Sequence, residues 1–415
     1  MALLILLVTF NLPLIYRELG RKKSVLVTYF FVLTLHQIVA VINAFWFTTI
    51  GADTDAISFN RIGHELAQSG IFSFSIGSQF YGNMLGVVYW LFGASHFLGV
   101  QLSILAFSLS CVVLLKILRQ LNLLQYQVWI LIAFGALPTM VLLGSITMRE
   151  SYQVLFFMMT VYFGIKMHLK GGLNRNFIFL ILSALCMGVF HKGLIVYMLF
   201  LIALLCFFTL KPTCRLLQIK TLRLRLLGMS IVFVVIFSTV VTLQIPGLGV
   251  LSALTDMELA EYTARYRDNS VLARATYVVP LDITSPFSFI TSSFVLYFYY
   301  LFAPFPWAIT HVVDIYAAIE AFMRMILLYY SIKHWRSAYG VQRRLLGLLL
   351  ILFFTMSFLW AMGTTNYATA MRHHMLTWWI LVVMGVPGLV DEGRRLYLSG
   401  IVRKVLSKNL MENEH

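Results

Sequence analysis

Charged residues are scarce in this sequence. Asp, Glu, Lys and Arg together make up 11% of its 415 residues, whereas hydrophobic residues make up 60%. The mean hydropathy of +0.87 lies above the range of soluble proteins. No long polar segment is present that would form a soluble domain, and apolar stretches of roughly 20 residues, long enough to cross a bilayer, recur along the chain. We therefore expect an all-α, polytopic integral membrane protein in which residues 1–415 form a single transmembrane domain.

Other signatures are absent as well. The four cysteines show no CxxC or metal-type spacing, so we interpret them as small buried residues. The sequence contains no P-loop and no GxGxxG motif, and we expect no cofactor. The N-terminus lacks a basic leader and a small-residue cleavage site, which predicts a retained span rather than a signal peptide.

Acidic residues are about half as frequent as basic ones. The chain has 31 Lys and Arg against 16 Asp and Glu, a net charge of +15. The excess is grouped between apolar stretches, which is typical of cytoplasmic loops and argues against nucleic-acid binding. The basic clusters lie at 17–23, 116–119, 166–175, 211–225, 333–344 and 394–408.

This distribution of charge predicts the path of the chain. With every basic cluster inside, about eleven crossings alternate, with the N-terminus outside and the C-terminus cytoplasmic. Residues 51–95 and 244–310 become outer loops, and 391–415 become a cytoplasmic tail. The expected crossings lie near 2–16, 24–49, 97–115, 127–146, 151–167, 177–190, 193–210, 226–244, 311–331, 345–362 and 374–390.

Two apolar segments do not fit this alternation. Residues 82–94 are too short to cross, and counting 286–308 as a crossing would move a basic cluster outside. We expect both to be interfacial or re-entrant, since such backbone is tolerated only where protein or a water-filled cavity covers it.

Acidic residues follow the second expected crossing. Residues 51–70 have the pattern of an amphipathic helix on the membrane surface, and Asp53 and Asp55 stand at its start. Either acid could act as a general base for an acceptor hydroxyl. For Asp55, the alternative is a helix cap stabilised by the dipole.

An Arg149–Glu150 pair lies between two expected outer span ends. A basic residue at the outer face runs against the usual charge bias. We expect Arg149 to bind phosphate through its forked guanidinium, with Glu150 orienting it or acting as a second acid. The alternative is a local ion pair or a side chain that reaches the interface.

Histidines and cations also interrupt apolar stretches at two further outer positions. His191 and Lys192 lie between two expected spans, where a tight hairpin is the simpler explanation, and Arg372 and His373 begin the last span. We group His191, Lys192, Arg372 and His373 with Arg149 as candidate phosphate-binding residues. Adjacent helical histidines point in different directions, so no metal is expected.

The loop at 256–282 is the most polar outer segment. Arginines suit phosphates and aromatic rings suit sugars, whereas a solvated loop helix would look much the same. The candidate glycan-binding residues are Arg265, Arg267, Arg274 and Tyr277.

These motifs support a resemblance to a known superfamily. An acid in the first large outer loop followed by an interfacial helix, GADTDAISF at 51–59, resembles the GT-C membrane glycosyltransferases. The segment MRESYQVLFFMMTVYF at 148–163 is similar to bacterial polysaccharide polymerases of the Wzy type, and LYFYYLFAPFPW at 296–307 resembles exopolysaccharide-cluster membrane proteins. A sizeable soluble outer domain, found in many members of the superfamily, is absent.

The resemblance implies a GT-C-like fold and a glycosyltransferase of the bacterial cytoplasmic (inner) membrane. Its donor and acceptor would be polyprenyl-(di)phosphate-linked glycans, joined at the outer leaflet by an exopolysaccharide or O-antigen type of polymerase. Membrane lipids surround such an enzyme, and a flippase and a chain-length regulator are candidate partners. Alternatives are transfer of one sugar from a polyprenyl-phosphate donor, ligation to lipid or protein, and a lipid-linked glycan transporter or flippase. The clustering of charge at one face, without a convincing repeat, favours an enzyme over a transporter.

The predicted topology can be tested by cysteine labelling. In a cysteine-free background, Ser270→Cys should react with a membrane-impermeant maleimide added from outside, because 256–282 is expected to be an outer loop. Ser337→Cys, in the basic cluster 333–344, is the matched inner position and should react only after permeabilisation. Protection of position 270 in intact cells would contradict the topology.

Overall fold

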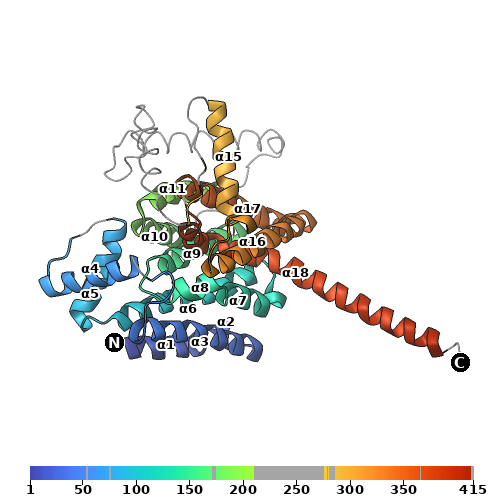
Figure 1. Cartoon of the computed structure of the whole chain (residues 1–415), viewed down its shortest axis with the longest axis horizontal. Helices are drawn as coiled ribbons and strands as arrows, with labels where there is room; N and C mark the ends of the chain where they lie inside the picture. The colour runs from blue at the N-terminus through green and yellow to red at the C-terminus, as the bar shows by residue number, and fades with distance from the viewer. Residues whose placement is uncertain are drawn as a thin grey trace.

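The computed structural model describes residues 1–52, 55–73, 76–170, 174–209, 275–277, 279, 286–364 and 366–412. In these ranges the regular secondary structure is helical, and an isolated bridge joins Thr276 to Asn366 (Figure 1). The first nine helices are α1 (Ala2–Ile15), α2 (Arg17–Gly20), α3 (Lys23–Phe45), α4 (Asp55–Ser69), α5 (Ser78–Phe92), α6 (His96–Gln120), η1 (Leu124–Tyr126), α7 (Gln127–Gly135) and α8 (Pro138–Gly144). They are followed by α9 (Glu150–Lys170), α10 (Arg175–Val189), α11 (Lys192–Thr209), α15 (Pro286–Phe302), η3 (Pro306–Ala308), α16 (Val312–Ser337), α17 (Gly340–Met362) and α18 (Tyr367–Glu412).

The helices confirm an all-α membrane protein, but the number of crossings is smaller than expected. In the described residues, α3, α6, α17 and the Tyr367–Ser399 part of α18 are long and apolar enough to cross a membrane. The bent pair formed by η1–α7 and α8 raises the number to five. The apolar helices α1, α10 and α11 are shorter, and the expected crossing at 226–244 lies outside the described residues. The structure therefore does not support eleven crossings.

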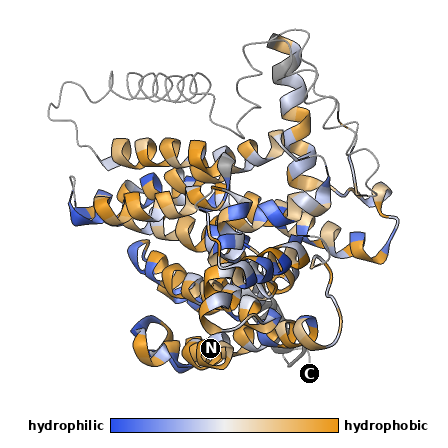
Figure 2. Cartoon of the chain, turned by 90° about the vertical axis from the view of Figure 1, so that its left-hand side faces the viewer, coloured by the Kyte–Doolittle hydropathy of each residue, from blue (hydrophilic) through white to orange (hydrophobic). Residues whose placement is uncertain are grey.

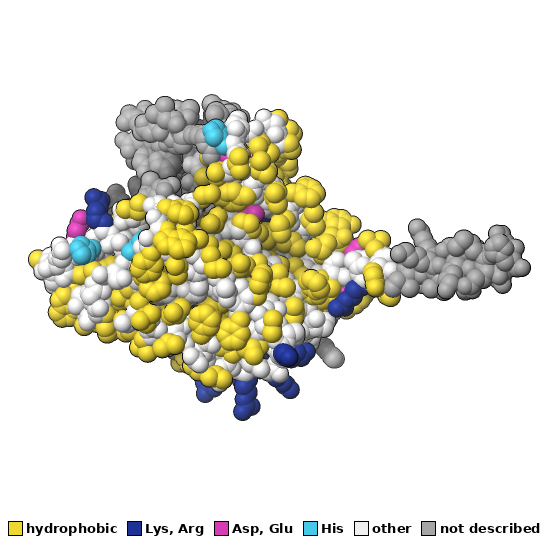
Figure 3. All heavy atoms as spheres, turned by 60° about the horizontal axis from the view of Figure 1, so that its bottom comes forward, with side chains coloured by type: hydrophobic (Ala, Val, Ile, Leu, Met, Phe, Trp, Pro, Cys, Tyr) yellow, Lys and Arg dark blue, Asp and Glu magenta, His cyan; other side chains and the backbone are white. Residues whose placement is uncertain are grey.

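The outer surface of the bundle is apolar, as a lipid environment requires. Hydrophobic side chains cover most of the face in Figure 3, and hydrophobic residues run along most helices in Figure 2. On α16 the exposed residues Val312, Ile315, Ile319 and Phe322 recur every three or four positions, while Glu320 is buried. This helix turns its apolar stripe outward and its charges inward, the reverse of a helix in a soluble protein.

Basic clusters that are far apart in the sequence meet in space. Arg119, at the end of α6, pairs with Glu18 of α2 at 3.1 Å. Lys333 of α16 pairs with Glu392 of α18 at 3.2 Å. These contacts join 116–119 to 17–23, and 333–344 to the start of the C-terminal tail. Each contact joins loops that the charge pattern assigns to the same side of the membrane.

Helices α4 and α5 form a hairpin at one side of the body (Figure 1). Phe59 of α4 lies edge-on to Tyr81 of α5 at 5.0 Å between ring centroids. A Cβ at Gly63 would approach the side chain of Leu85 to 2.9 Å, so this glycine permits the close packing. The segment 82–94, expected as a short interfacial element, thus belongs to a 15-residue helix that begins at Ser78 and packs on α4.

Helix α15 projects from the body in both ribbon views, and buried side chains satisfy its C-terminal end (Figures 1 and 2). The last carbonyls of a helix have no intrahelical donor. Here the Arg324 Nη1 donates to the Leu301 carbonyl at 2.5 Å, and the His374 Nε2–H donates to the Tyr300 carbonyl at 2.9 Å. A cation at this end also complements the helix dipole. The helix in the segment 286–308 therefore ends at Phe302, where side chains of α16 and α18 bind its last carbonyls.

A break between α7 and α8 is held from two sides. The chain bends by 62° between the two helices. His36 of α3 hydrogen-bonds the Gly135 carbonyl at 3.0 Å. Glu320 of α16 accepts hydrogen bonds from the N–H of Thr139 at 2.7 Å and from its hydroxyl at 2.6 Å. Glu320 and Arg324, one turn apart on α16, thus bind different helix ends.

Removing the carboxylate at this break should destabilise the fold. Glu320→Ala leaves the N–H and hydroxyl of Thr139 buried without their acceptor, which costs about 2–3 kcal/mol. The apparent melting temperature of the detergent-purified chain measures this loss. Glu65→Ala is the matched control, because the exposed Glu65–Arg61 pair contributes roughly 0–1 kcal/mol. Equal melting temperatures for the two variants would contradict the account.

Candidate functional site

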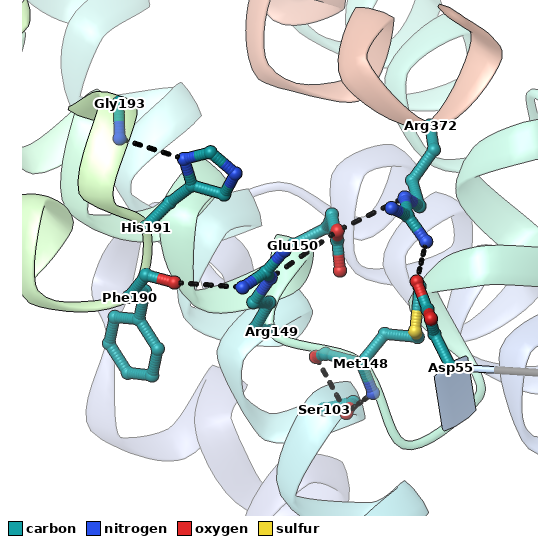
Figure 4. A network of polar contacts seen from close by, with 9 residues as sticks. All are labelled: Asp55, Ser103, Met148, Arg149, Glu150, Phe190, His191, Gly193 and Arg372. Carbon is teal, nitrogen blue, oxygen red and sulfur yellow. Dashed lines mark hydrogen bonds and ion pairs between the residues drawn. The ribbon is translucent and has the colours of Figure 1, made fainter. Parts of the chain in front are cut away.

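Ionisable residues from four distant segments converge at one place (Figure 4). Asp55 comes from the start of α4, and Arg149 and Glu150 from the link before α9 and its first residue. His191 comes from the link between α10 and α11, and Arg372 from the second turn of α18. All five were expected at the outer face, and the structure brings them together. Their chemical roles remain predictions.

Arg372 is the centre of this network. Its Nη1 donates to Oδ2 of Asp55 in a charge-assisted hydrogen bond, and its Nε lies 3.3 Å from Oε1 of Glu150. Arg149 approaches the same Glu150 oxygen, with its Nε at 3.8 Å. The Arg149 Nη1 donates to the carbonyl of Phe190 at 3.4 Å. Two arginines therefore share one glutamate, and one of them also holds an aspartate.

The two carboxylates differ sharply in burial. The side chain of Glu150 is 3% exposed, and its Oε2 has no hydrogen-bond partner in the described residues. The side chain of Asp55 is 44% exposed. Breaking a buried ion pair costs about 3–5 kcal/mol, whereas an exposed pair contributes roughly 0–1 kcal/mol. The pairs made by Glu150 are thus the buried part of the network, and the pair made by Asp55 is its exposed part.

The segment that carries Arg149 is fastened to the bundle. Ser103 of α6 contacts both the N–H and the carbonyl of Met148, each at 3.4 Å. The guanidinium of Arg149 also lies over the ring of Phe59, 5.7 Å from its centroid. The link between α8 and α9 is therefore tied to α6 and to the α4–α5 hairpin. These contacts explain how an arginine next to an apolar span keeps one orientation.

His191 is a neutral member of the site. Its Nδ1 accepts a hydrogen bond from the Gly193 N–H at 3.1 Å, which leaves the ring proton on Nε2. Burial, followed by the charges of Arg149 and Arg372, lowers the pKa of His191 to about 3. A neutral imidazole can donate one hydrogen bond to a phosphate oxygen but adds no positive charge. As a candidate phosphate-binding residue, His191 can therefore act only as a neutral hydrogen-bond donor.

Trp360, near the end of α17, was missed by the sequence reasoning. Its ring stacks on the ring of His373, with 3.9 Å between the centroids, and lies edge-on to the ring of His191, with 4.7 Å between the centroids. The Thr364 hydroxyl lies 3.0 Å from Nδ1 of His373. His373 therefore faces the tryptophan and this hydroxyl. Proximity to an expected outer span end is the only sequence signal for Trp360.

Of the candidate glycan-binding residues, Tyr277 lies in the described part of the chain. Tyr277 is buried, and its hydroxyl donates to the carbonyl of Thr364 at 3.0 Å, next to the contact with His373. Lys192 is the first residue of α11, but its side chain is outside the described part of the chain. The other candidates, Asp53, Arg265, Arg267 and Arg274, lie outside the described residues.

In the described ranges, no group of three or more His, Cys, Asp or Glu side chains is arranged to hold a metal ion. The expectation of a metal-free protein stays a prediction.

Comparison with known proteins identified no family: no family model, no curated protein and no solved structure matches the chain. The class that fold and site define is an all-α membrane protein with a network of buried and half-exposed charges. The resemblance to glycosyltransferases remains an expectation based on short motifs.

The neutral state of His191 predicts a dependence of stability on pH. Unfolded histidine takes up a proton near pH 6.5, whereas folded His191 does so only near pH 3. Between these values the unfolded chain binds more protons, so lowering the pH reduces the free energy of unfolding, by at most about 1.4 kcal/mol per pH unit.

His191→Gln should remove this contribution. The change in melting temperature between pH 7.5 and pH 5.0 should be smaller in the variant than in the wild type. His64→Gln, on the exposed side of α4, is the matched control and should keep the wild-type change. If His191→Gln keeps it as well, His191 is not buried in its neutral form.

Proposed function

We propose that this protein is a membrane glycosyltransferase that acts on polyprenyl-(di)phosphate-linked glycans at the outer face of the bacterial cytoplasmic membrane. The polymerase type agrees best with the short outer segments. The single observation that carries the proposal is the network of Arg372, Arg149, Glu150 and Asp55 at one end of an apolar bundle. It combines cations for a phosphate with a solvent-accessible carboxylate for a hydroxyl proton.

The reaction needs these two kinds of group. The acceptor hydroxyl oxygen forms a bond to the anomeric carbon of the donor sugar, while the bond from that carbon to the phosphate oxygen breaks. The electron pair of the broken bond leaves with the polyprenyl (di)phosphate, and guanidinium groups stabilise the charge that develops there. The hydroxyl proton passes to a carboxylate.

The described residues suggest a division of labour. Arg372 and Arg149 are the candidate phosphate ligands, with the His191 Nε2–H as a neutral donor beside them. Asp55 is the half-exposed carboxylate next to Arg372 and is a candidate base together with Asp53. Glu150 is too buried and too closely paired to be the first choice as a base, and it fits better as the residue that orients both arginines.

The finer architecture also belongs to this proposal. The motif resemblance implies a GT-C-like arrangement, and the basic clusters favour an N-terminus outside and a C-terminus in the cytoplasm. The pairing of Arg119 with Glu18 supports a common side for the clusters 116–119 and 17–23, and that of Lys333 with Glu392 supports a common side for the cluster 333–344 and the start of the C-terminal tail.

A transporter or flippase is the second candidate, and one observation favours it. Transporters commonly build their binding sites from broken helices near the middle of the membrane. The α7–α8 pair is bent by 62° at its break, and the carboxylate of Glu320 binds the start of α8. A transporter would bind the phosphate of a lipid-linked glycan without breaking a bond.

Reconstitution separates these functions. The purified chain in vesicles, supplied with a polyprenyl-diphosphate-linked oligosaccharide, should produce a ladder of longer products. One added sugar from a polyprenyl-phosphate donor would indicate a single-sugar transferase, and transbilayer movement without a new bond a transporter. Arg372→Gln should lower the transfer rate by about 100-fold or more, the range for removal of one preorganised electrostatic contact. Wild-type product formation that is unaffected by Arg372→Gln would contradict the site assignment.

A further inference from the structure

Among the described residues, Arg372 pairs with two carboxylates that differ in exposure. Glu150 approaches the Nε side of the guanidinium from the interior, and Asp55 binds Nη1 from the half-exposed side (Figure 4). An anion that arrives from outside therefore meets the Asp55 side of Arg372 first. The weaker and more exposed pair is the one that an incoming anion can replace.

We propose that Asp55 and a phosphate oxygen of the ligand compete for the same side of Arg372, so that phosphate binding releases the Asp55 carboxylate. In the ligand-free protein, Asp55 stands where a phosphate oxygen binds. A carboxylate and a phosphate both present oxygen acceptors to guanidinium, and both can be held in a charge-assisted hydrogen bond. The buried pair between Glu150 and the Nε of Arg372 is kept during this exchange, because the phosphate replaces Asp55 at Nη1.

The exchange orders the events at the site. Arg372 neutralises Asp55 as long as the two are bonded, and the carboxylate is then a hydrogen-bond acceptor with an occupied oxygen. Once a phosphate takes its place, Asp55 is free beside the bound donor. It can then accept the proton of a sugar hydroxyl. This consequence rests on the proposed glycosyl transfer, whereas the exchange itself requires only a ligand that carries a phosphate.

The position of Asp55 makes such a release mechanically simple. It is the first residue of α4, and the remainder of that helix is packed on α5 through Phe59 and Gly63. Side-chain rotation at the helix end is therefore sufficient, and the hairpin need not separate. The second arginine, Arg149, keeps its own contacts with Glu150 and the Phe190 carbonyl.

Binding of farnesyl diphosphate to the purified full-length chain tests the exchange, with farnesol as the uncharged control. Asp55→Asn removes the competing charge and should tighten binding of the diphosphate by about two- to fivefold, the range for one exposed ion pair. Arg372→Gln should weaken it, and Asp55→Asn should give no tightening in the Arg372→Gln background. Glu65→Gln removes an exposed carboxylate from the same helix and should leave the affinity within about 1.5-fold of wild type.

Several results would overturn the exchange. These are weaker or unchanged diphosphate binding in Asp55→Asn, equal tightening in Glu65→Gln, and absence of diphosphate binding in every form. A wild-type measurement guards against misfolded variants: reaction of Asp55 with a carbodiimide should rise when farnesyl diphosphate binds, and a fall would contradict the release. Because none of these readouts requires sugar transfer, the exchange can hold even if the glycosyltransferase proposal fails.

Discussion

The buried carboxylate of Glu150 is the constraint on which the rest of the site depends. A single charge at this depth is costly, and the cost is offset only when cations lie close to it. Arg149 and Arg372 supply them, and in doing so they join the start of α9 to α18. Arg372 then reaches Asp55 on α4, so the position of the outer hairpin is also linked to this one glutamate.

Similar use of buried polar groups recurs in the fold. Glu320 and His36 hold the break between α7 and α8, and Arg324 and His374 satisfy the end of α15. In each case a backbone group that lacks an intrahelical partner receives one from a distant helix. Lipid offers no such partner, so the protein must provide it. Buried polar and charged side chains are therefore needed inside the bundle wherever its helices end or break.

The sequence predicted the class of fold and the grouping of the charges better than their pairing. Long apolar runs identify α3, α6 and α17 because hydrophobicity over some 20 residues is a local property. For Asp55, Glu150 and Arg372, the charge pattern predicted only that all three lie on the same side of the membrane. That Arg372 holds both acids depends on the packing of α18 against α9 and on the position of Asp55 at the start of α4, which no local pattern contains. For the same reason Trp360 was overlooked.

A double-mutant cycle between Glu150 and Arg372 tests the central claim most directly. The stabilities of Glu150→Gln, Arg372→Gln and the double variant would be measured by thermal unfolding against the wild type. If the buried pair organises the site, each single change takes a partner away from a buried charge, and the double variant is more stable than the sum of the single effects by about 2 kcal/mol or more. Additive effects would show that Glu150 and Arg372 act independently and would contradict the account.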